Sequence, residues 1–347
     1  YLALYPALAA AIVARMTNLK WKLLVALPLA WMLGELLRGW VMTGFPWNLL
    51  AYTQLDGLLA GYFGIVGAYG VGAITTMCAG LLYFAWISPN ARQRFSWLMA
   101  FAMIMLGGLG LLQISWTQPH GKPLKLALLQ GNIPQNLKWD PQARLQTLAI
   151  YQKLTLQAQD ADLVIWPEAS IPAYEHQVQD DFLPSLQSYL KQHNQAALVG
   201  ILRRDASQQH TLNSALLLNG ESDEIQRYDK RHLVPFGEYF PIPDWMRALL
   251  VKWQMPHSDV ASGAAQQAPL RVKGHTLGLS ICFEDVFPDE LRTRVPDAGF
   301  IVNTTNDAWF DDSVALTQHL DIARARALEL GRPVIQASNT GVTAAVD

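Results

Sequence analysis

The first third of the chain consists of long apolar runs separated by short polar loops. The runs cover residues 2–14, 23–37, 58–87 and 97–116, and the first of them is interpreted as the remnant of a longer helix. A helix needs about 20 apolar residues to cross ~30 Å of hydrocarbon. Four such runs in succession are difficult to bury inside a large water-soluble core, which is the alternative explanation. The pattern therefore predicts a transmembrane helical bundle over residues 1–118.

Basic residues in the short loops predict how this bundle crosses the membrane. Arg15, Lys20 and Lys22 lie between the first two runs, and Arg92 and Arg94 lie between the last two. The middle loop, residues 39–57, contains no Lys or Arg. Because basic loops stay in the cytoplasm, we expect the middle loop and everything after the last run to face outward. The chemistry of that outer part must use substrates that are present there, without ATP.

From residue 119 to residue 347, short apolar segments alternate with amphipathic ones. Strands are predicted at 124–129, 163–166, 196–201, 214–218, 224–228, 276–281 and 299–303, and helices at 141–159, 182–193 and 315–330. We expect Asp140 to cap the first helix and Pro141 to open it. The Asn219-Gly220 pair predicts a hairpin between two of the strands. Strands that alternate with helices indicate a layered α/β domain with helices on the sheet faces.

Composition and residue spacing argue against some classes of partner and cofactor. Hydrophobic residues make up 51% of the chain and charged residues 16%, well below the ~25% charged residues of ordinary soluble proteins. A net charge of -2 and the lack of a basic patch argue against nucleic acid as a partner. The eight His residues show no metal-ligand spacing, so we expect neither a metal nor a cofactor. The chain has no initiator Met, and we interpret it as a piece of a longer protein.

Three chemically active side chains each follow an apolar, strand-like run. Glu168 ends ADLVIWPE, Lys230 follows IQRYD and Cys282 ends LGLSIC. Singly, each has an ordinary explanation, namely a surface carboxylate, a solvated lysine and a small buried hydrophobe. Together they can form a nucleophilic site in which Glu168 takes the thiol proton and Lys230 stabilises an oxyanion. Cys78 lies in an apolar run, so a disulfide with Cys282 is not expected.

Two other features have open interpretations. Glu35 and Arg38 are three residues apart near the outer end of a predicted helix, where they form either a satisfied pair or a contact to lipid head groups. The segment 236–256 has an apolar face at helical spacing, formed by Trp245, Met246, Leu249, Leu250 and Trp253. It predicts either a surface helix on its own domain or a mobile lid that enters the outer leaflet and guides acyl chains to Cys282.

The motifs around these residues resemble those of the nitrilase, or carbon–nitrogen hydrolase, superfamily. WPEAS, YDKRHLVPFGEY and SICFEDVFPD look like its Glu, Lys and Cys motifs. Within it, GELLRGWVMTGFPWN, QGNIPQNLKWDP, NTTNDAWF and RARALELGRP closely resemble the apolipoprotein N-acyltransferase family of Gram-negative bacteria, from about Trp31 onward. The resemblance implies an αββα sandwich over residues 119–347 on a membrane bundle over residues 1–118, with both ends of the family's chain missing. Asp311 departs from the pattern, because the family has Gly there.

The resemblance also implies roles for individual residues. Glu168 would be the base, Lys230 the oxyanion stabiliser and Cys282 the nucleophile, with Glu238 as a second essential carboxylate that orients Lys230 or the thiol. Further residues would shape the pocket and its lid, namely Glu284, Phe283, Trp139, Asn303 and Trp309. The implied reaction moves an acyl chain from a phospholipid to Cys282 as a thioester, then to the α-amino group of a diacylated apolipoprotein. The implied location is the bacterial inner membrane, with the catalytic domain in the periplasm.

Two other functions remain open from the sequence. The first is a membrane-anchored nitrilase-type amidase that hydrolyses a small amide, which the membrane bundle and the apolar lid segment disfavour. The second is a membrane scaffold with an inactive nitrilase fold, which the presence of Glu168, Lys230 and Cys282 together disfavours.

Overall fold

The computed structural model describes residues 1–240, 242, 260–294 and 296–347. The chain divides into two compact units. The first comprises residues 1–119 with 324–332 and 347, and the second comprises residues 120–323 and 333–346. The predicted lid residues Trp245, Met246, Leu249, Leu250 and Trp253 lie outside the described residues.

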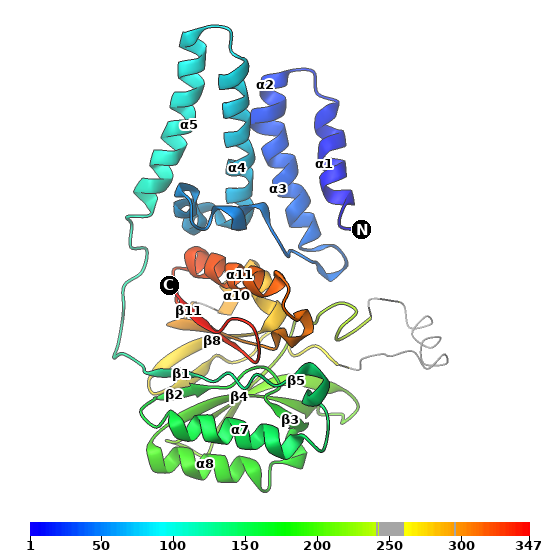
Figure 1. The fold of residues 1–347 in the computed structure, drawn as a ribbon, viewed down its shortest axis with the longest axis vertical. Helices are drawn as coiled ribbons and strands as arrows, with labels where there is room; N and C mark the ends of the chain where they lie inside the picture. Colours follow the sequence, from blue (N-terminus) through cyan, green and yellow to red (C-terminus); the bar gives the residue numbers. More distant parts are fainter. Residues whose placement is uncertain (241, 243–259, 295) are drawn as a thin grey trace. The chain divides into compact units, whose positions relative to one another are not determined.

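The first unit is helical (Figure 1). Its helices are α1 (Leu4–Ala14), α2 (Leu19–Trp21), the π-helical turn η1 (Lys22–Ala26), α3 (Leu27–Arg38), α4 (Phe63–Ile87) and α5 (Ala91–Leu111), with short 3-10 turns η2 (Val41–Thr43), η3 (Leu50–Gln54) and η4 (Leu58–Tyr62). Two of the described helices, Leu58–Ile87 and Ala91–Leu111, are long and apolar enough to cross a membrane. The predicted run at 58–87 is confirmed as long and apolar enough to cross a membrane, but it consists of η4 followed by α4, and α4 is kinked at Gly67, which has a φ of 64°.

The last predicted run had the wrong limits. The helix begins at Ala91, because Asn90 caps it by accepting a hydrogen bond from the Gln93 amide, at 2.9 Å. It ends at Leu111 rather than continuing to residue 116. Hydropathy alone placed it too late, because the polar first turn, which contains Arg92 and Arg94, belongs to the same helix.

Glu35 and Arg38 form the pair that one of the two interpretations expected. Glu35 is 6% exposed, and its Oε1 accepts a hydrogen bond from the Leu50 amide at 2.9 Å. Arg38 Nη2 lies 3.8 Å from the same oxygen. A carboxylate buried and bonded in this way favours a structural role over contact with lipid head groups.

The second unit is built on two β-sheets. The strands of the first are β1 (Leu126–Leu128), β2 (Leu163–Ile165), β3 (Ile171–Tyr174), β4 (Ala196–Arg204), β5 (Thr211–Asn219) and β6 (Ile225–Asp229). Their order is β1-β2-β4-β5-β6, with β3 paired to β4. Strands β1, β2 and β4 are parallel, whereas β4, β5 and β6 are antiparallel. The predicted hairpin is confirmed, with Leu218 opposite Ile225.

The second sheet has the order β11-β10-β9-β8-β7. Its strands are β7 (Leu270–Val272), β8 (His275–Ile281), β9 (Phe300–Thr305), β10 (Val334–Ser338) and β11 (Ala344–Val346). Strands β8, β9 and β10 are parallel, and β7 and β11 run antiparallel at the edges. The carboxyl ends of β8 and β9 therefore meet at one edge of this sheet, which is where parallel sheets commonly place their functional residues.

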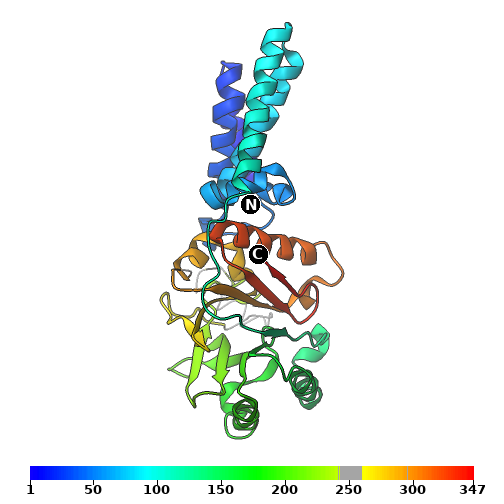
Figure 2. The same ribbon diagram turned by 90° about the vertical axis from the view of Figure 1, so that its left-hand side faces the viewer.

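The two sheets pack face to face, and helices cover their outer faces (Figures 1 and 2). Leu163 and Ile165 of β2 point to the other sheet, while Val164 between them points to α7 (Arg144–Gln157) and α8 (Phe182–His193). This period of two is what a strand buried on both faces requires. The outer face of the second sheet carries α10 (Pro288–Arg294) and the first part of α11 (Ala315–Leu330). The predicted αββα sandwich is confirmed.

The sequence predicted helices α8 and α11 with their observed limits. The start of α7 was wrong by three residues. Asp140 caps a separate turn, because its side chain accepts from the Gln142 amide and its carbonyl accepts from the Ala143 amide, so the helix begins only at Arg144. The short elements α6 (Gln135–Lys138), α10, β3, β7 and β10 were missed.

Candidate active site

Glu168 lies on a tight turn just after β2. The next residue, Ala169, has a φ of 45°, in the left-handed region that residues with a side chain seldom adopt. Gly200 of β4 lies directly against this turn. A Cβ on Gly200 would lie 2.4 Å from both the Pro167 carbonyl oxygen and the Ala169 nitrogen. The turn that carries Glu168 therefore depends on a glycine in the neighbouring strand.

Lys230 follows β6 and is 1% exposed. Its ammonium lies 2.9 Å from a carboxylate oxygen of Glu238 and 3.4 Å from Oε1 of Glu168. Burial alone would lower the pKa of Lys230, but the Glu238 and Glu168 carboxylates outweigh it, and the pKa is raised. Lys230 is therefore a fixed positive charge at neutral pH.

Two amides that the sequence analysis missed hold the Glu168 carboxylate. Asn213 Nδ2 donates to Glu168 Oε1 at 2.7 Å and to Glu238 Oε1 at 3.1 Å. The main-chain amide of Asn306, just after β9, donates to Glu168 Oε2 at 3.0 Å. Asn213 interrupts the apolar strand TLNSALLLN, and a lone amide in a buried strand was the signal that could have identified it.

Cys282 directly follows β8 and has a φ of 53°. It opens a short 3-10 helix, η6 (Cys282–Val286). A side chain held at a strained strand-to-helix turn is the arrangement by which α/β-hydrolases present a nucleophile. Burial and the negative charge of Glu168 raise the pKa of the Cys282 thiol to about 12, against the opposing influence of Lys230 and His319. The Cys282 thiol is therefore neutral at rest and would need a base in order to act as a nucleophile.

A second buried ammonium lies beside Glu168 and was also missed. Lys138, on α6, is 4% exposed, and its Nζ donates to the main-chain carbonyl of Glu168 at 2.9 Å. Burial lowers the pKa of Lys138 to about 8, although Glu168 and Cys282 oppose the shift. Two ammonium groups, Lys138 and Lys230, thus face two carboxylates, Glu168 and Glu238, so the buried charges balance.

Glu284 connects the segments that carry Lys230 and Cys282. It is fully buried and accepts from the main-chain amides of Arg231 at 2.9 Å and Ile281 at 2.8 Å. These amides are the immediate neighbours of Lys230 and Cys282 in the chain. The Tyr228 hydroxyl and the Arg294 guanidinium complete the shell of this carboxylate.

The other expected pocket residues divide into two groups. Phe283 and Asn303 are buried, the first against the rings of His232 and Phe287 and the second bonded to Asp285. Trp139 and Trp309 are 47% and 68% exposed. Of the expected set, only these two tryptophans are therefore open to an incoming molecule.

Asp311, where the family pattern has Gly, has a φ of 43° and a ψ of -142°. Glycine populates this backbone region readily and other residues only with strain. The unusual residue therefore occupies a position that suits glycine.

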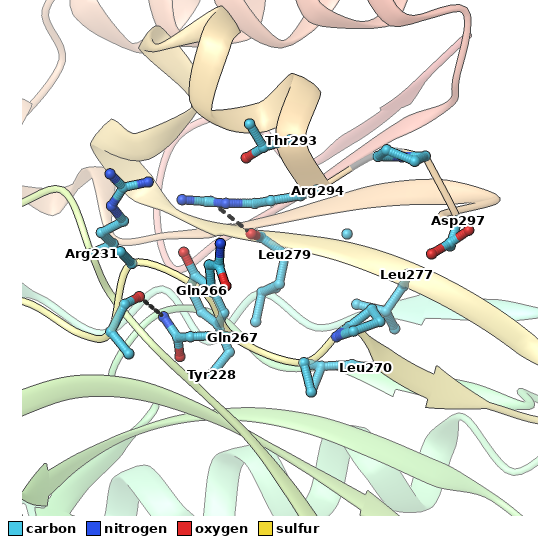
Figure 3. Close-up of a pocket in the computed structure, with 16 residues that line it drawn as sticks. Tyr228, Arg231, Gln266, Gln267, Leu270, Leu277, Leu279, Thr293, Arg294 and Asp297 are labelled. Carbon is cyan, nitrogen blue, oxygen red and sulfur yellow. Dashed lines mark hydrogen bonds between the residues drawn. The ribbon is translucent and has the colours of Figure 1, made fainter.

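A cavity of about 310 Å³ lies between β6, β7, β8 and α10 (Figure 3). Tyr228, Arg231, Gln266 and Thr293 line it, together with Arg294, whose Nη1 donates to the Leu279 carbonyl at 2.9 Å. Glu168, Lys230 and Cys282 are not among its described lining residues. In the described part of the chain, no group of three or more His, Cys, Asp and Glu residues could hold a metal ion.

Comparison with known proteins agrees with this fold. The model of the carbon–nitrogen hydrolase family matches residues 125–347. The second unit, with an acid, a lysine and a cysteine at strand ends, is thus a carbon–nitrogen hydrolase domain. The model of the apolipoprotein N-acyltransferase N-terminal domain matches residues 1–81.

Curated relatives define the family more closely. Apolipoprotein N-acyltransferase of Methylococcus capsulatus is 40% identical over 349 residues, which cover 100% of this chain and 68% of the relative. That of Vibrio cholerae is 41% identical over 359 residues, covering 100% of this chain and 70% of the relative. Among solved structures, Nit3 of Saccharomyces cerevisiae is 19% identical with a TM-score of 0.45, over 63% of this chain and 78% of that one. The chain belongs to the apolipoprotein N-acyltransferase family.

Proposed function

We propose that this chain transfers an acyl chain from a phospholipid to the N-terminal α-amino group of a diacylglyceryl-cysteine apolipoprotein. Identity of about 40% along the whole chain to acyltransferases of that name supports it. The observation that carries the chemistry is the buried Lys230 ammonium between Glu168 and Glu238, beside a cysteine on a strained turn. Acyl transfer needs this combination of base, positive charge and nucleophile.

In the first half-reaction, Glu168 accepts the proton of the Cys282 thiol while Sγ attacks the carbonyl carbon of the phospholipid ester. The carbonyl oxygen becomes an oxyanion, which the Lys230 ammonium stabilises. As the intermediate collapses, the carbon–oxygen bond of the ester breaks. The proton on Glu168 passes to the departing glyceryl oxygen, and lysophospholipid leaves.

In the second half-reaction, the neutral α-amino group of the apolipoprotein attacks the thioester carbonyl. Glu168 takes a proton from the attacking nitrogen, and Lys230 again stabilises the oxyanion. The carbon–sulfur bond breaks, an amide is formed, and the sulfur regains its proton from Glu168. The thioester retains the acyl-transfer potential of the ester, so the cycle consumes no nucleotide.

Glu238, Asn213 and Lys138 support these steps without reacting. Glu238 keeps Lys230 charged and in place, and Asn213 fixes the two carboxylates relative to each other. Lys138 holds the turn of Glu168 through its carbonyl. Glu284 orients the chain on both sides of the site. Trp139 and Trp309 are proposed to contact the acyl chain, because they expose large apolar rings.

A phospholipid with a labelled acyl chain, supplied with a synthetic diacylated lipopeptide, tests this function. We expect label on the protein first and then on the peptide as an amide. Label that appears as free fatty acid, with the peptide unmodified, would instead support a hydrolase. No reaction with either phospholipid or small amides would support an inactive scaffold.

We also propose that the catalytic domain faces the periplasm from the inner membrane, because the loops that contain Arg15 to Lys22 and Arg92 to Arg94 are basic. Gln93 and Gln118 are both exposed; Gln93 lies in the first turn of the helix Ala91–Leu111, and Gln118 follows its other end. In intact cells, a cysteine at Gln118 should react with a membrane-impermeant thiol reagent and a cysteine at Gln93 should not. The opposite pattern would contradict this orientation.

A further inference from the structure

A buried histidine with two carboxylate partners lies behind the active site. His319, on α11, is completely buried, and neither Asp285 nor Asp307 is more than 1% exposed. His319 Nδ1 lies 2.8 Å from Oδ1 of Asp307, and its Nε2 lies 3.3 Å from Oδ1 of Asp285. No step of the proposed mechanism uses these three residues.

The cluster contains a charged imidazolium. Burial alone would lower the pKa of His319, but Asp285 and Asp307 outweigh it and raise the pKa well above its usual value. Both ring nitrogens then carry protons, so one donates to each carboxylate. The remaining carboxylate oxygens are also bonded, Asp285 Oδ2 by Asn303 of β9 and Asp307 Oδ2 by Ser338 of β10.

The two carboxylates belong to two of the segments that form the site. Asp285 is in η6, the short helix that begins with Cys282. Asp307 opens the turn η7 (Asp307–Phe310) and directly follows Asn306, whose amide binds Glu168. One side chain thus connects the loop of the nucleophile with the loop that holds the base.

The charge of the cluster also reaches the nucleophile. His319 and Lys230 lower the pKa of Cys282, whereas Glu168 and Asp307 raise it, and Lys138 is coupled to the same thiol. Without its proton, His319 would no longer offset the negative charge of Asp307 at Cys282. That change would disfavour the thiolate that attacks the substrate.

We propose that His319 is a positioning residue for the acyl transfer described above: its buried imidazolium, bonded to Asp285 and Asp307, holds the η6 and η7 loops so that Cys282 and Glu168 stay aligned. This inference rests on the proposed function for its consequence in lipid chemistry. Its effect on the thiol itself can be measured without any lipid.

The test uses the full chain with His319→Gln, His319→Lys and Asp285→Asn. His193→Gln is the matched control, because His193 is exposed at the end of α8. Two quantities are measured on protein whose fold is verified by thermal melting. One is the single-turnover rate of acyl-enzyme formation from labelled phospholipid. The other is the rate of Cys282 alkylation by iodoacetamide between about pH 6 and pH 10.

We expect His319→Gln to slow acyl-enzyme formation by on the order of 10-fold to 100-fold, the usual cost of losing alignment. The apparent KM for phospholipid should change little, and the alkylation profile should move to higher pH. His319→Lys, which keeps the charge, should recover part of both effects, and His193→Gln should show neither.

A folded His319→Gln variant with the original acylation rate and alkylation profile would overturn the proposal. If His319→Gln does not fold, Asp285→Asn decides, because it removes the charge of one partner and leaves an isosteric side chain. Asp285→Asn that acylates at the original rate would likewise overturn it. Failure of the wild-type chain to acquire an acyl group would contradict the proposed function alone, and the alkylation profiles would still test His319.

Discussion

The main-chain amide of Asn306 donates a hydrogen bond to the side chain of Glu168, across 138 residues of sequence. Glu168 follows β2 in the first sheet and Asn306 follows β9 in the second. Glu168 is therefore held by segments of both sheets at once. The two sheets must pack together before the site can form. Cys282 follows β8, which is the neighbour of β9 in the second sheet. We therefore expect a small backbone change near Glu168 to reduce the rate of acyl transfer even when the domain stays folded.

Glu168→Gln should separate two kinds of thiol reactivity. The variant loses the base, so acyl-enzyme formation should fall by on the order of 10²-fold or more. Glu168 also raises the pKa of Cys282, so its removal should lower that pKa from about 12 and increase the thiolate fraction at a given pH. Alkylation by iodoacetamide at mildly alkaline pH should then be as fast as in the wild type or faster. Parallel loss of both reactions would show that Glu168 acts through the structure.

Lys230→Met should slow both reactions, in contrast to Glu168→Gln. The substitution removes the charge that stabilises the oxyanion, which is worth about 10²-fold to 10³-fold in rate. It also removes a positive charge that lowers the pKa of Cys282, so alkylation at a given pH should be slower. The pair Glu168 and Glu238 would be left without its ammonium, so thermal melting must accompany the kinetics. Normal acylation by a folded variant would exclude Lys230 from the chemistry.

The sequence predicted the elements that local pattern determines. Strands β2, β4, β8 and β9 and helices α8 and α11 follow from apolar spacing and from clear caps or breakers, and the sandwich follows from their alternation. Cys282 was identifiable because a reactive side chain ends a strand. In the first unit, the start of α5 was predicted too late. Its first turn is polar, and hydropathy alone does not identify a polar turn as part of an apolar helix.

The supporting residues were harder to predict, because distant segments determine their environment. Lys138, in the polar stretch QNLKWD, has the sequence context of a solvated lysine. It is buried because α6 packs against the Glu168 turn, fixed there by Asn339 through Ile133 and by Asn306 through Gln135.

Glu284 and Asn303 were expected at the wall of a pocket. They are fully buried instead, since Tyr228, Arg294 and Asp285 supply their partners. No local pattern reveals such pairings.

Gly200→Ala should impair catalysis while the domain remains folded. The new methyl group would lie 2.4 Å from the backbone on both sides of Glu168, so that turn must move. A displacement of this kind costs about 1–3 kcal/mol and misplaces the base. Gly278→Ala is the control, because Gly278 lies in buried β8 and its nearest contact, with Ala298, would be an ordinary 3.6 Å. We expect loss of acylation in the first variant only. Equal activity of both would contradict the close approach of β4 to the Glu168 turn.

Asp311→Gly should stabilise the protein. Asp311 has a φ of 43° and a ψ of -142°, and glycine removes the strain of that conformation, worth about 1 kcal/mol or more. The matched control is Asp312→Gly, because Asp312 is not among the described residues with positive φ. Asp312→Gly should leave the melting temperature unchanged or lower it slightly. A lower melting temperature for Asp311→Gly would show that the aspartate makes a contact worth more than the strain.

Covalent catalysis at Cys282 is the central claim, and intact-protein mass measurement tests it directly. After incubation with a phospholipid of defined acyl chains, the protein should gain the mass of one acyl group, and peptide mapping should locate it on Cys282 and not on Cys78. Cys78→Ala should keep the adduct, and Cys282→Ala should lose it. Addition of a diacylated lipopeptide should return the protein to its original mass. An adduct that survives Cys282→Ala, or transfer of the acyl chain without any adduct on Cys282, would contradict the account.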